Sequence, residues 1–257
     1  MAREKEIAMS TYPIRFTVMT YNVWASARWP EREESLKHFL QFHQPDILCL
    51  QELRPETRDL IDTVLTGHQR IDDPFEGWIR EGNIYFNQTL FEMVGHGAED
   101  LQMYEQLRRL FWVRLRYRFA PNRTIFVSTA HYTWAGNPDE KAGGVNPRYA
   151  QAQRTVAAFY KLAAENEPLL FMGDLNDFLH PIRILREGGL TDSFSGLGRH
   201  TDFTHPASPT AKGTPQSIDW IFHRGPIAPI TSEVIDFFWE DLAPSDHKPV
   251  LATYRLI

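Results

Sequence analysis

Short apolar runs and longer helical stripes alternate along this chain of 257 residues. Runs rich in β-branched and aromatic residues predict strands, and apolar residues that recur every three or four positions predict helices. The predicted strands are 14–22, 46–52, 110–117, 124–131, 168–174, 217–222, 232–239 and 248–256. The predicted helices are 30–43, 55–67, 148–166 and a short one at 181–186. A hairpin is expected over 83–97, with its turn near Asn87 and Gln88.

The order of these elements mixes hairpins with strand–helix–strand units, which argues against a purely parallel sheet or a regular (β/α)₈ barrel. Two packed mixed β-sheets with helices outside them fit the order better, so we expect an α/β fold. The length suits one large domain, and 42% apolar residues are enough for a sizeable core. We therefore expect a single domain over 14–257, preceded by an N-terminal extension, 1–13, that can be flexible.

Polar and ionisable side chains end several of the predicted strands. They are Asn22, Glu52, His131, Asp174 and Asn176, together with Asp246 and His247 just before the last strand. Each alone is compatible with an ordinary turn, but the pattern recurs from strand to strand. Asp219 lies inside the apolar run SIDWIF, where a charge is costly unless it has a partner. Because functional groups gather beyond the carboxyl ends of strands in open α/β sheets, this set suits a hard divalent cation and general acid–base chemistry.

Other features of the sequence narrow the function. The formal net charge is −6, so a strongly basic nucleic-acid footprint is absent, although a local basic patch is compatible with it. The single cysteine, Cys49, lies in an apolar run and is expected to be a core thiol. There is no G-x-S-x-G, H-E-x-x-H, Walker-type or G-x-G-x-x-G motif. No stretch is long and apolar enough to span a membrane, and the charged N-terminus lacks an apolar signal core, so we expect a cytoplasmic protein.

Six short motifs occur in order along almost the whole chain: TYN, LQE, TAH, GDLN, IDWIF and SDH. In this order and strand context they resemble the endonuclease/exonuclease/phosphatase superfamily of metal-dependent phosphoesterases. The segments EGNIYFNQTLFEMV and PRYAQAQRTVAAF are similar to that family's middle hairpin and to the helix before its GD-x-N strand. The resemblance implies a four-layer α/β sandwich, with two mixed sheets packed face to face and helices outside. It also implies hydrolysis of a phosphoester bond with Mg²⁺ or Mn²⁺.

Three residues are candidate metal ligands. Glu52 is a carboxylate at a strand tip, the kind of single-acid anchor that Mg²⁺ accepts while it keeps several waters. Asn22 offers a neutral oxygen to the same ion or to its water, although asparagine also commonly ends a strand. Asp246 is either a second metal contact or a support for the site.

Five further residues are candidate catalytic residues. Asp174 resembles the family residue that orients and deprotonates the attacking water, and Asn176 resembles its neighbour that holds this water or a phosphate oxygen. His131 and His247 are candidates to donate hydrogen bonds to the phosphate, and a near-neutral pKa would also allow proton transfer. Asp219 resembles the acid that holds the SDH histidine in position. Phosphoryl transfer needs mainly charge neutralisation and in-line positioning, which such a set can supply.

Two long loops, 132–147 and 196–216, are expected to border the site and to carry its specificity. Their aromatic residues Trp134 and Phe203 either stack on a base or sugar or simply anchor the loops. The candidate phosphate contacts are the cations Arg148, Arg199 and Lys212. Many family members carry Arg just before the IDWIF segment, where this chain has Ser217, so one substrate contact is expected to be absent.

We therefore expect a divalent-metal-dependent phosphoester hydrolase, either a phosphodiesterase or a phosphatase, that uses in-line attack by water. A nuclease acting on DNA or RNA is one alternative. A membrane-lipid phosphodiesterase and a non-catalytic binding member of the fold are others. Retention of all the acids and histidines favours an enzyme, and the lack of a clear exposed apolar or basic insertion argues against stable membrane association. The expected partner is a phosphoester, small molecule or nucleic acid, and the protein is expected to be a monomer.

Overall fold

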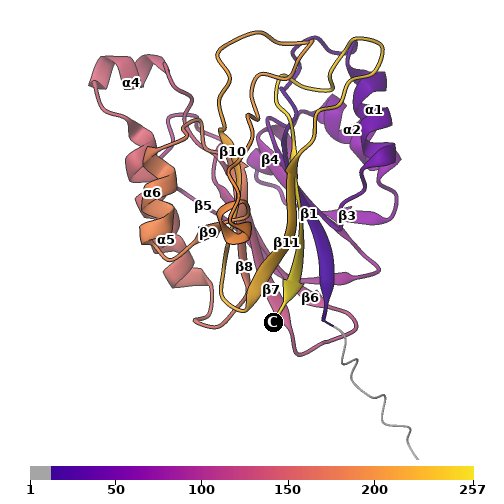
Figure 1. Cartoon of the computed structure of the whole chain (residues 1–257), viewed down its shortest axis with the longest axis vertical. Helices are drawn as coiled ribbons and strands as arrows, with labels where there is room; N and C mark the ends of the chain where they lie inside the picture. The colour runs from indigo at the N-terminus through magenta and orange to yellow at the C-terminus, as the bar shows by residue number, and fades with distance from the viewer. Residues whose placement is uncertain (1–12) are drawn as a thin grey trace, which may run out of the picture.

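The computed structural model describes residues 13–257, so the predicted N-terminal extension lies outside the described residues apart from Pro13. Over residues 13–257 the strands form two six-stranded mixed sheets, which pack face to face between two layers of helices (Figure 1). The prediction of a four-layer α/β sandwich is confirmed. Within this part of the chain no helix combines the length and the apolar character needed to cross a bilayer.

The first sheet has the strand order β11–β12–β1–β2–β4–β3. Its strands are β1 (Arg15–Asn22), β2 (Ile47–Gln51), β3 (His68–Arg70), β4 (Gly82–Asn87), β11 (Ile227–Val234) and β12 (Val250–Leu256). β1 and β2 are parallel, and the other neighbours are antiparallel. Because β1 and β2 run in the same direction, Asn22 and Glu52 lie at the same edge of the sheet.

The second sheet has the strand order β5–β6–β7–β8–β10–β9. Its strands are β5 (Phe91–Glu99), β6 (Leu110–Tyr117), β7 (Thr124–His131), β8 (Leu169–Asp174), β9 (Thr191–Asp192) and β10 (Asp219–Arg224). β7 and β8 are parallel, and the other neighbours are antiparallel. The register pairs His131 with Asp174 and Asp174 with Asp219, so these three residues form one row across β7, β8 and β10.

Residues 13–257 contain the helices α1 (Glu33–Phe42), α2 (Pro55–Val64), α3 (Gly77–Arg80), α4 (Pro138–Gly143), α5 (Pro147–Leu162) and α6 (His180–Glu187), with a 3₁₀ turn at Ser195–Leu197. The longer helices cover the outer faces of the two sheets. α1 and α2 lie beside the first sheet, and α5 and α6 lie beside the second (Figure 1). The short helix α4 stands at the end of the loop that follows β7, a segment predicted as loop (Figure 1).

Buried apolar side chains fill the space between the sheets and beneath both helical layers. Val18 and Met172 represent the two sheets in the central core, which also contains Cys49, so the prediction of a core thiol is confirmed. Phe39 of α1 and Phe159 of α5 are fully buried in the two outer cores. Each such side chain contributes about 1.5–3 kcal/mol by leaving water, and together they fix the spacing between the sheets.

The predicted hairpin over 83–97 is wrong, because β4 and β5 belong to different sheets. The turn forms near Asn87, as expected, but it carries the chain from the first sheet to the second. Phe86 before the turn and Phe91 after it are both buried in the central core. Two strands that bury their apolar faces in the same core show the same alternating sequence pattern in two cases. They can pair as a hairpin in one sheet, or they can lie in two sheets that face each other across the core.

Several predicted element boundaries also differ from the structure. β11 ends at Val234, so residues 235–239 lie outside the strand predicted there. Their apolar residues have another use, since the ring of Phe237 packs against Phe39 of α1 with centroids 5.5 Å apart. α1 begins at Glu33 and not at Pro30. An apolar run in the sequence indicates burial but not the partner, and residues 235–239 pack against a helix instead of forming part of a strand.

Gly173 allows β8 to bring Asp174 to the edge of the sheet. Its φ is +153°, and a β-carbon built there would overlap the carbonyl oxygen of Ala130 on β7. Only glycine fits where two backbones approach so closely. The two residues of the Gly–Asp pair therefore have separate roles. Gly173 allows β8 to approach β7 closely, and Asp174 is the first residue of the candidate site on this strand.

Gly173→Ala is expected to lower the free energy of unfolding by about 3 kcal/mol, because the added methyl group must push β8 away from β7. Gly67→Ala is the matched control, since a β-carbon at Gly67 meets nothing within 4 Å, and it should change stability by about 0.5 kcal/mol or less. Urea denaturation of both variants measures the difference. Equal stability of the two variants would contradict the close approach of β7 and β8.

Candidate active site

The strand ends of the two sheets bring the predicted catalytic and metal-binding residues to one end of the sandwich. Asn22, at the end of β1, connects the sheets: its Nδ2 donates to Oε1 of Glu52 at 3.3 Å and to Oδ2 of Asp174 at 3.0 Å. On the second sheet, Nε2 of His131 lies 3.9 Å from Oε1 of Glu52. The residues that sequence analysis grouped by strand position therefore lie in direct contact.

Asp174 is the centre of this group. Its Oδ2 accepts the hydrogen bond from Asn22, lies 3.4 Å from Nε2 of His131 and lies 3.7 Å from Nε2 of His247. Its Oδ1 accepts the backbone N–H of Asn176 at 2.9 Å. One oxygen is therefore fixed by the turn after β8, and the other faces both histidines.

The backbone at Glu52 and Asn176 adopts the left-handed conformation, with φ of 55° and 48°. Asparagine tolerates this conformation better than most residues. The side chain of Asn176 is also held in place, because its Nδ2 donates to the carbonyl oxygen of Tyr132 at 3.0 Å. Glutamate does not favour it, so the strand end at Glu52 is strained by about 1 kcal/mol or more. Such strain is common where a side chain is held for function.

His247 and Asp219 form a buried pair, with Nδ1 of His247 2.8 Å from Oδ2 of Asp219. Burial alone lowers the pKa of a histidine, but the carboxylates of Asp219 and Asp174 raise the pKa of His247 well above its ordinary value. These carboxylates therefore favour the imidazolium form of His247. It donates Nδ1–H to Asp219 and directs Nε2 toward Asp174.

His131 has the opposite character. Burial lowers the pKa of its imidazole well below the ordinary value, and the positive charges of Arg108 and His247 lower it further. These effects favour the neutral form of His131, although it lies beside the same carboxylate as His247. Sequence analysis treated the two histidines alike, whereas their surroundings make one a cation and the other a neutral group.

Glu52 and Asp246 provide oxygen donors suited to a divalent cation. Burial raises the pKa of Asp246 to about 6, and the charges of Glu52 and Asp174 also raise it, against the opposite effect of His247. Carboxylates crowded in this way repel one another unless a cation lies among them. Oxygen ligands of this kind fit Mg²⁺ or Mn²⁺, so the donor set fits the metal that the family resemblance implies.

Asn22 is oriented differently from the expectation. Its Oδ1 accepts the backbone N–H of Trp24 at 2.9 Å, while its Nδ2 faces the carboxylates. The side-chain amide of Asn22 therefore holds the carboxylates of Glu52 and Asp174 in position through hydrogen bonds from its N–H groups. A direct contact between its oxygen and a cation stays a prediction.

The three predicted substrate-binding residues differ in their exposure. Trp134 is 45% exposed on the loop after β7, and Lys212 is exposed on the loop before β10. Arg148 is buried at the start of α5, where Nη2 lies 2.6 Å from Glu140 and Nη1 donates to the carbonyl oxygen of Thr133 at 2.9 Å. Its guanidinium fastens the loop around α4, and a contact between Arg148 and substrate stays a prediction.

Arg32 lies behind the site and was not expected from the sequence. Its side chain is fully buried between the segment after β1 and the segment that leads into Asp246 and His247. The guanidinium donates to the backbone carbonyl oxygens of Trp24, Ala25, Ala27 and Pro244. An arginine before an amphipathic helix ordinarily predicts solvent exposure, so no sequence pattern identifies this role.

Two other residues complete the surroundings of His247. Ser245 Oγ donates to the carbonyl oxygen of Asn22 at 2.7 Å and accepts the N–H of His247 at 3.2 Å, which fixes the SDH turn against β1. His205, on the loop before β10, lies with Nε2 3.9 Å from Oδ2 of Asp246. That loop was expected to border the site, but a histidine in a segment without periodicity gives no sign of which way it points.

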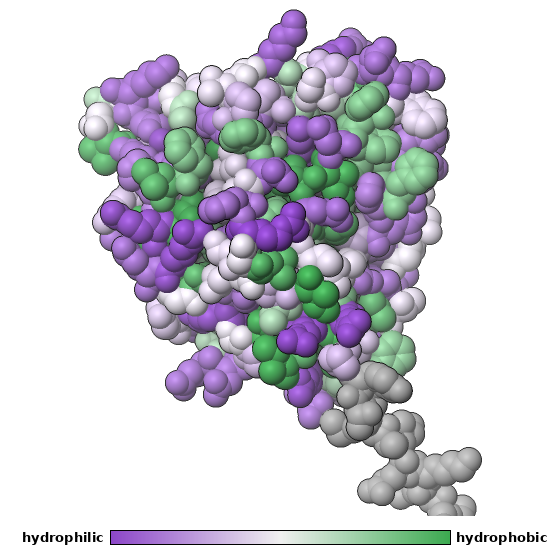
Figure 2. Space-filling model, in the orientation of Figure 1, coloured by the Kyte–Doolittle hydropathy of each residue, from purple (hydrophilic) through white to green (hydrophobic). Residues whose placement is uncertain are grey.

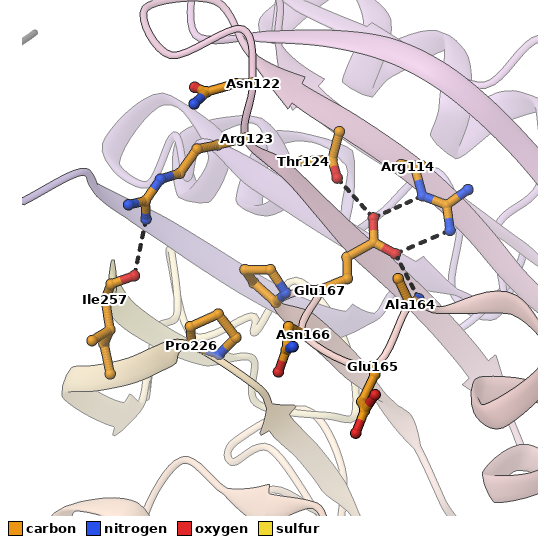
Figure 3. Close-up of a pocket in the computed structure, with 11 residues that line it drawn as sticks. Arg114, Asn122, Arg123, Thr124, Ala164, Glu165, Asn166, Glu167, Pro226 and Ile257 are labelled. Carbon is orange, nitrogen blue, oxygen red and sulfur yellow. Dashed lines mark hydrogen bonds and ion pairs between the residues drawn. The ribbon is translucent and has the colours of Figure 1, made fainter.

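A surface cleft of about 740 Å³ lies at the opposite ends of the strands and contains none of the predicted site residues (Figure 3). Several of its polar groups bond to one another. Glu167 accepts hydrogen bonds from Nε of Arg114 at 2.7 Å and from Thr124 at 2.9 Å, and Arg123 donates to the carbonyl oxygen of Ile257 at 2.9 Å. Because this cleft contains none of the predicted site residues, we take the other end of the sheets as the candidate active site.

Solved structures with the same fold share little sequence with this chain. A humanised TDP2 of D. rerio has a TM-score of 0.77 at 18% identity, covering 93% of this chain and 98% of that one. An endonuclease/exonuclease/phosphatase family protein from Bacteroides thetaiotaomicron has a TM-score of 0.77 at 19% identity, with coverage of 96% and 99%. A mannosyl-6-phosphatase from the same bacterium has a TM-score of 0.75 at 19% identity, with coverage of 92% and 98%.

Comparison of the sequence itself gives the family. No curated protein matches it. The profile of the Endonuclease/Exonuclease/phosphatase family matches residues 19–247, which include every residue of the site described above. Since the match extends over most of the chain and the fold agrees with it, this chain belongs to the endonuclease/exonuclease/phosphatase family.

Proposed function

We propose that this chain is a divalent-metal-dependent phosphoester hydrolase that acts by in-line attack of water. The observation that carries the proposal is the position of Asp174, whose Oδ2 lies 3.4 Å from Nε2 of His131 and 3.7 Å from Nε2 of His247. A carboxylate base beside two nitrogen donors suits attack of water on phosphorus. Family membership supports the same class of reaction.

Glu52 and Asp246 would hold the cation, and Mg²⁺ or Mn²⁺ suits their oxygen atoms. When bound, the cation supplies positive charge that offsets the charge of the phosphate and of the leaving oxygen. The protein must hold its carboxylates in position around the cation. Asn22 holds the carboxylate of Glu52 through a hydrogen bond of 3.3 Å from its Nδ2.

Asp174 acts as the general base in this mechanism. Burial raises the pKa of its carboxyl, and the charge of Asp219 raises it further, against the effect of His247. A higher pKa makes the carboxylate a better acceptor for the proton of the attacking water. The hydrogen bond from Asn176 fixes Oδ1, and Oδ2, which faces both histidines, would receive the proton.

The two histidines act on the phosphate oxygens. His247 donates Nε2–H from an imidazolium whose charge the neighbouring carboxylates maintain. His131 donates from a neutral ring and therefore adds a directed hydrogen bond without a second full charge. Charge that develops on the phosphoryl oxygens during the reaction then meets donors that are already in position.

The rim of the site supports a compact phosphoester that carries an apolar group. Trp134, Phe178 and Phe203 are 45%, 60% and 59% exposed, so they do not serve as buried anchors of their loops. Figure 2 shows hydrophobic side chains among polar ones over the end of the molecule that carries these loops. The net charge of −6 and the internal pairing of Arg148 leave little positive charge for a long phosphodiester backbone.

A nuclease is the second candidate. One specific observation favours it, the likeness at 19% identity to a D. rerio TDP2 structure described as complexed with a single-strand DNA product. The exposed aromatic residues are compatible with stacking on unpaired bases. A lipid phosphodiesterase and a non-catalytic binding protein have less support, and the cytoplasmic location and monomeric state stay predictions.

Glu52→Gln is expected to lower activity about 100-fold or more at millimolar Mg²⁺, because the neutral amide no longer anchors the cation, while the melting temperature stays near that of the wild type. Activity is measured on a panel of bis-p-nitrophenyl phosphate, sugar and inositol phosphates, sphingomyelin, single-stranded RNA and abasic DNA. Excess chelator should abolish hydrolysis by the wild type.

Glu165→Gln is the matched control, because Glu165 is exposed at the opposite end of the sheets. It should retain wild-type activity. Full activity of Glu52→Gln, or hydrolysis in excess chelator, would rule out the metal mechanism. Failure of the wild type on every substrate of the panel with both Mg²⁺ and Mn²⁺ would count against the proposed function itself.

His247→Ala is expected to lower kcat by about 10³-fold, because it removes the proton donor, and Asp219→Asn somewhat less. The double variant should be little worse than His247→Ala alone, since residues that act as a unit are not additive. Steady-state kinetics of the three variants measure this. Strictly additive losses would show that Asp219 serves something other than His247.

Asp219→Asn should also shift the pH profile of kcat. The charge of Asp219 raises the pKa of His247, so the imidazolium persists to higher pH in the wild type. Removal of that charge lowers the pKa and moves the alkaline limb of the profile to lower pH. An alkaline limb that does not move would contradict a coupling between the two groups.

Hydrolysis of a compact substrate should depend only weakly on salt. A protein that neutralises several phosphates of a nucleic acid loses affinity with a log–log slope of about −0.9 for each phosphate. We therefore expect kcat/KM on the best substrate to change less than about threefold between roughly 50 and 200 mM salt. Efficient degradation of plasmid DNA with a steep slope would favour the nuclease instead.

A further inference from the structure

His205, which the proposed reaction does not use, lies beside two groups that it does use. Its Nε2 is 3.9 Å from Oδ2 of Asp246, and its ring centroid is 4.9 Å from that of His247. A backbone hydrogen bond of 2.6 Å from Lys248 to Thr204 fastens the loop to the segment that carries Asp246 and His247. The backbone around His205 is therefore held against the segment that carries Asp246 and His247.

These three side chains together form a ligand set for a cation. His205 and His247 each offer a ring nitrogen and Asp246 offers an oxygen, and the three atoms lie within 4.8 Å of one another. Ligands at about 2.1 Å from a tetrahedral Zn²⁺ lie about 3.4 Å apart, so shifts of about 1 Å close the set. The side chain of His205 is 28% exposed, which gives an ion access from solvent.

His247 already has the hydrogen bond that a metal-binding histidine needs. Its Nδ1 is bonded to Asp219 at 2.8 Å, so Nε2, 3.9 Å from Asp246, is the atom available to a metal. Histidine ligands almost always donate their other ring N–H to a carboxylate or carbonyl group. Two nitrogens and one oxygen favour Zn²⁺, whereas the carboxylates around Glu52 favour Mg²⁺.

We propose that His205, Asp246 and His247 form an inhibitory site for Zn²⁺. The inference rests on the proposed function, in which Nε2 of His247 carries a proton toward the phosphate. A zinc ion on Nε2 displaces that proton to solvent, and it also draws Asp246 away from the Mg²⁺ site. Zinc binding and catalysis are therefore mutually exclusive, and His205 supplies the selectivity for zinc.

The site is tested first by binding alone, on the full chain without Mg²⁺ or substrate. Calorimetric titration with Zn²⁺ and the visible absorption of bound Co²⁺ report affinity and nitrogen ligation. His205→Ala should bind Zn²⁺ at least 10-fold more weakly and lose the Co²⁺ band. His200→Ala is the matched control, because His200 is an exposed histidine of the same loop outside the ligand set, and it should behave as the wild type.

Two further variants keep the binding test decisive. His205→Gln preserves most of the side-chain volume and should show the same loss of zinc affinity, so an effect of His205→Ala on folding is separated from one on binding. Glu52→Gln should retain the high-affinity binding of Zn²⁺, since Glu52 does not belong to the ligand set. Equal zinc affinity of the wild type and both His205 variants would overturn the proposal, as would loss of zinc binding in Glu52→Gln alone.

Inhibition is then measured with Mg²⁺ in excess, and each variant is normalised to its own zinc-free rate. The zinc concentration for half inhibition should rise at least 10-fold in His205→Ala and stay unchanged in His200→Ala. If no phosphoester is hydrolysed, the proposed function fails, while the binding data still decide the zinc site. If hydrolysis occurs but neither zinc affinity nor inhibition depends on His205, the zinc site fails and the proposed function stands.

Discussion

Burial of several carboxylates at one point is the constraint on which the rest of this structure depends. Asp174 and Asp219 face each other across β8 and β10, and both are almost entirely buried. Two like charges in such surroundings repel each other and lose their hydration. The imidazolium of His247 and the N–H groups of Asn22 and Asn176 offset this cost. The elements that position these donors are therefore as necessary to the site as the acids themselves.

The two sheets share this task, which explains why their packing matters for chemistry. The hydrogen bond from Asn22 to Asp174 crosses from one sheet to the other, so it has the right length only if the core between the sheets is full. A second polar contact, from Nε2 of Gln51 on β2 to Thr129 on β7 at 2.9 Å, joins the sheets close to the site. A cavity in the central core is therefore expected to disturb the position of the Asp174 carboxylate.

The sequence predicted the layers and the strand ends because each polar residue follows an apolar run that identifies its own strand. It did not predict that β4 and β5 join different sheets, since apolar faces that meet across a core leave the same pattern as a hairpin. Buried charges were missed for a related reason. Arg32 and Arg148 are satisfied by partners far away in sequence or by backbone oxygens, and no local pattern records such partners.

The two histidines show why geometry, and not residue type, assigns the chemistry. Both contact the same oxygen of Asp174, yet the pKa of one is lowered and that of the other is raised. His131 stands at one end of the row across β7, β8 and β10, near the charge of Arg108. His247 comes from outside the row and bridges its two acids. The register that places Asp219 opposite Asp174 therefore favours a charge on His247, because it puts a carboxylate near each of the two ring nitrogens of that residue.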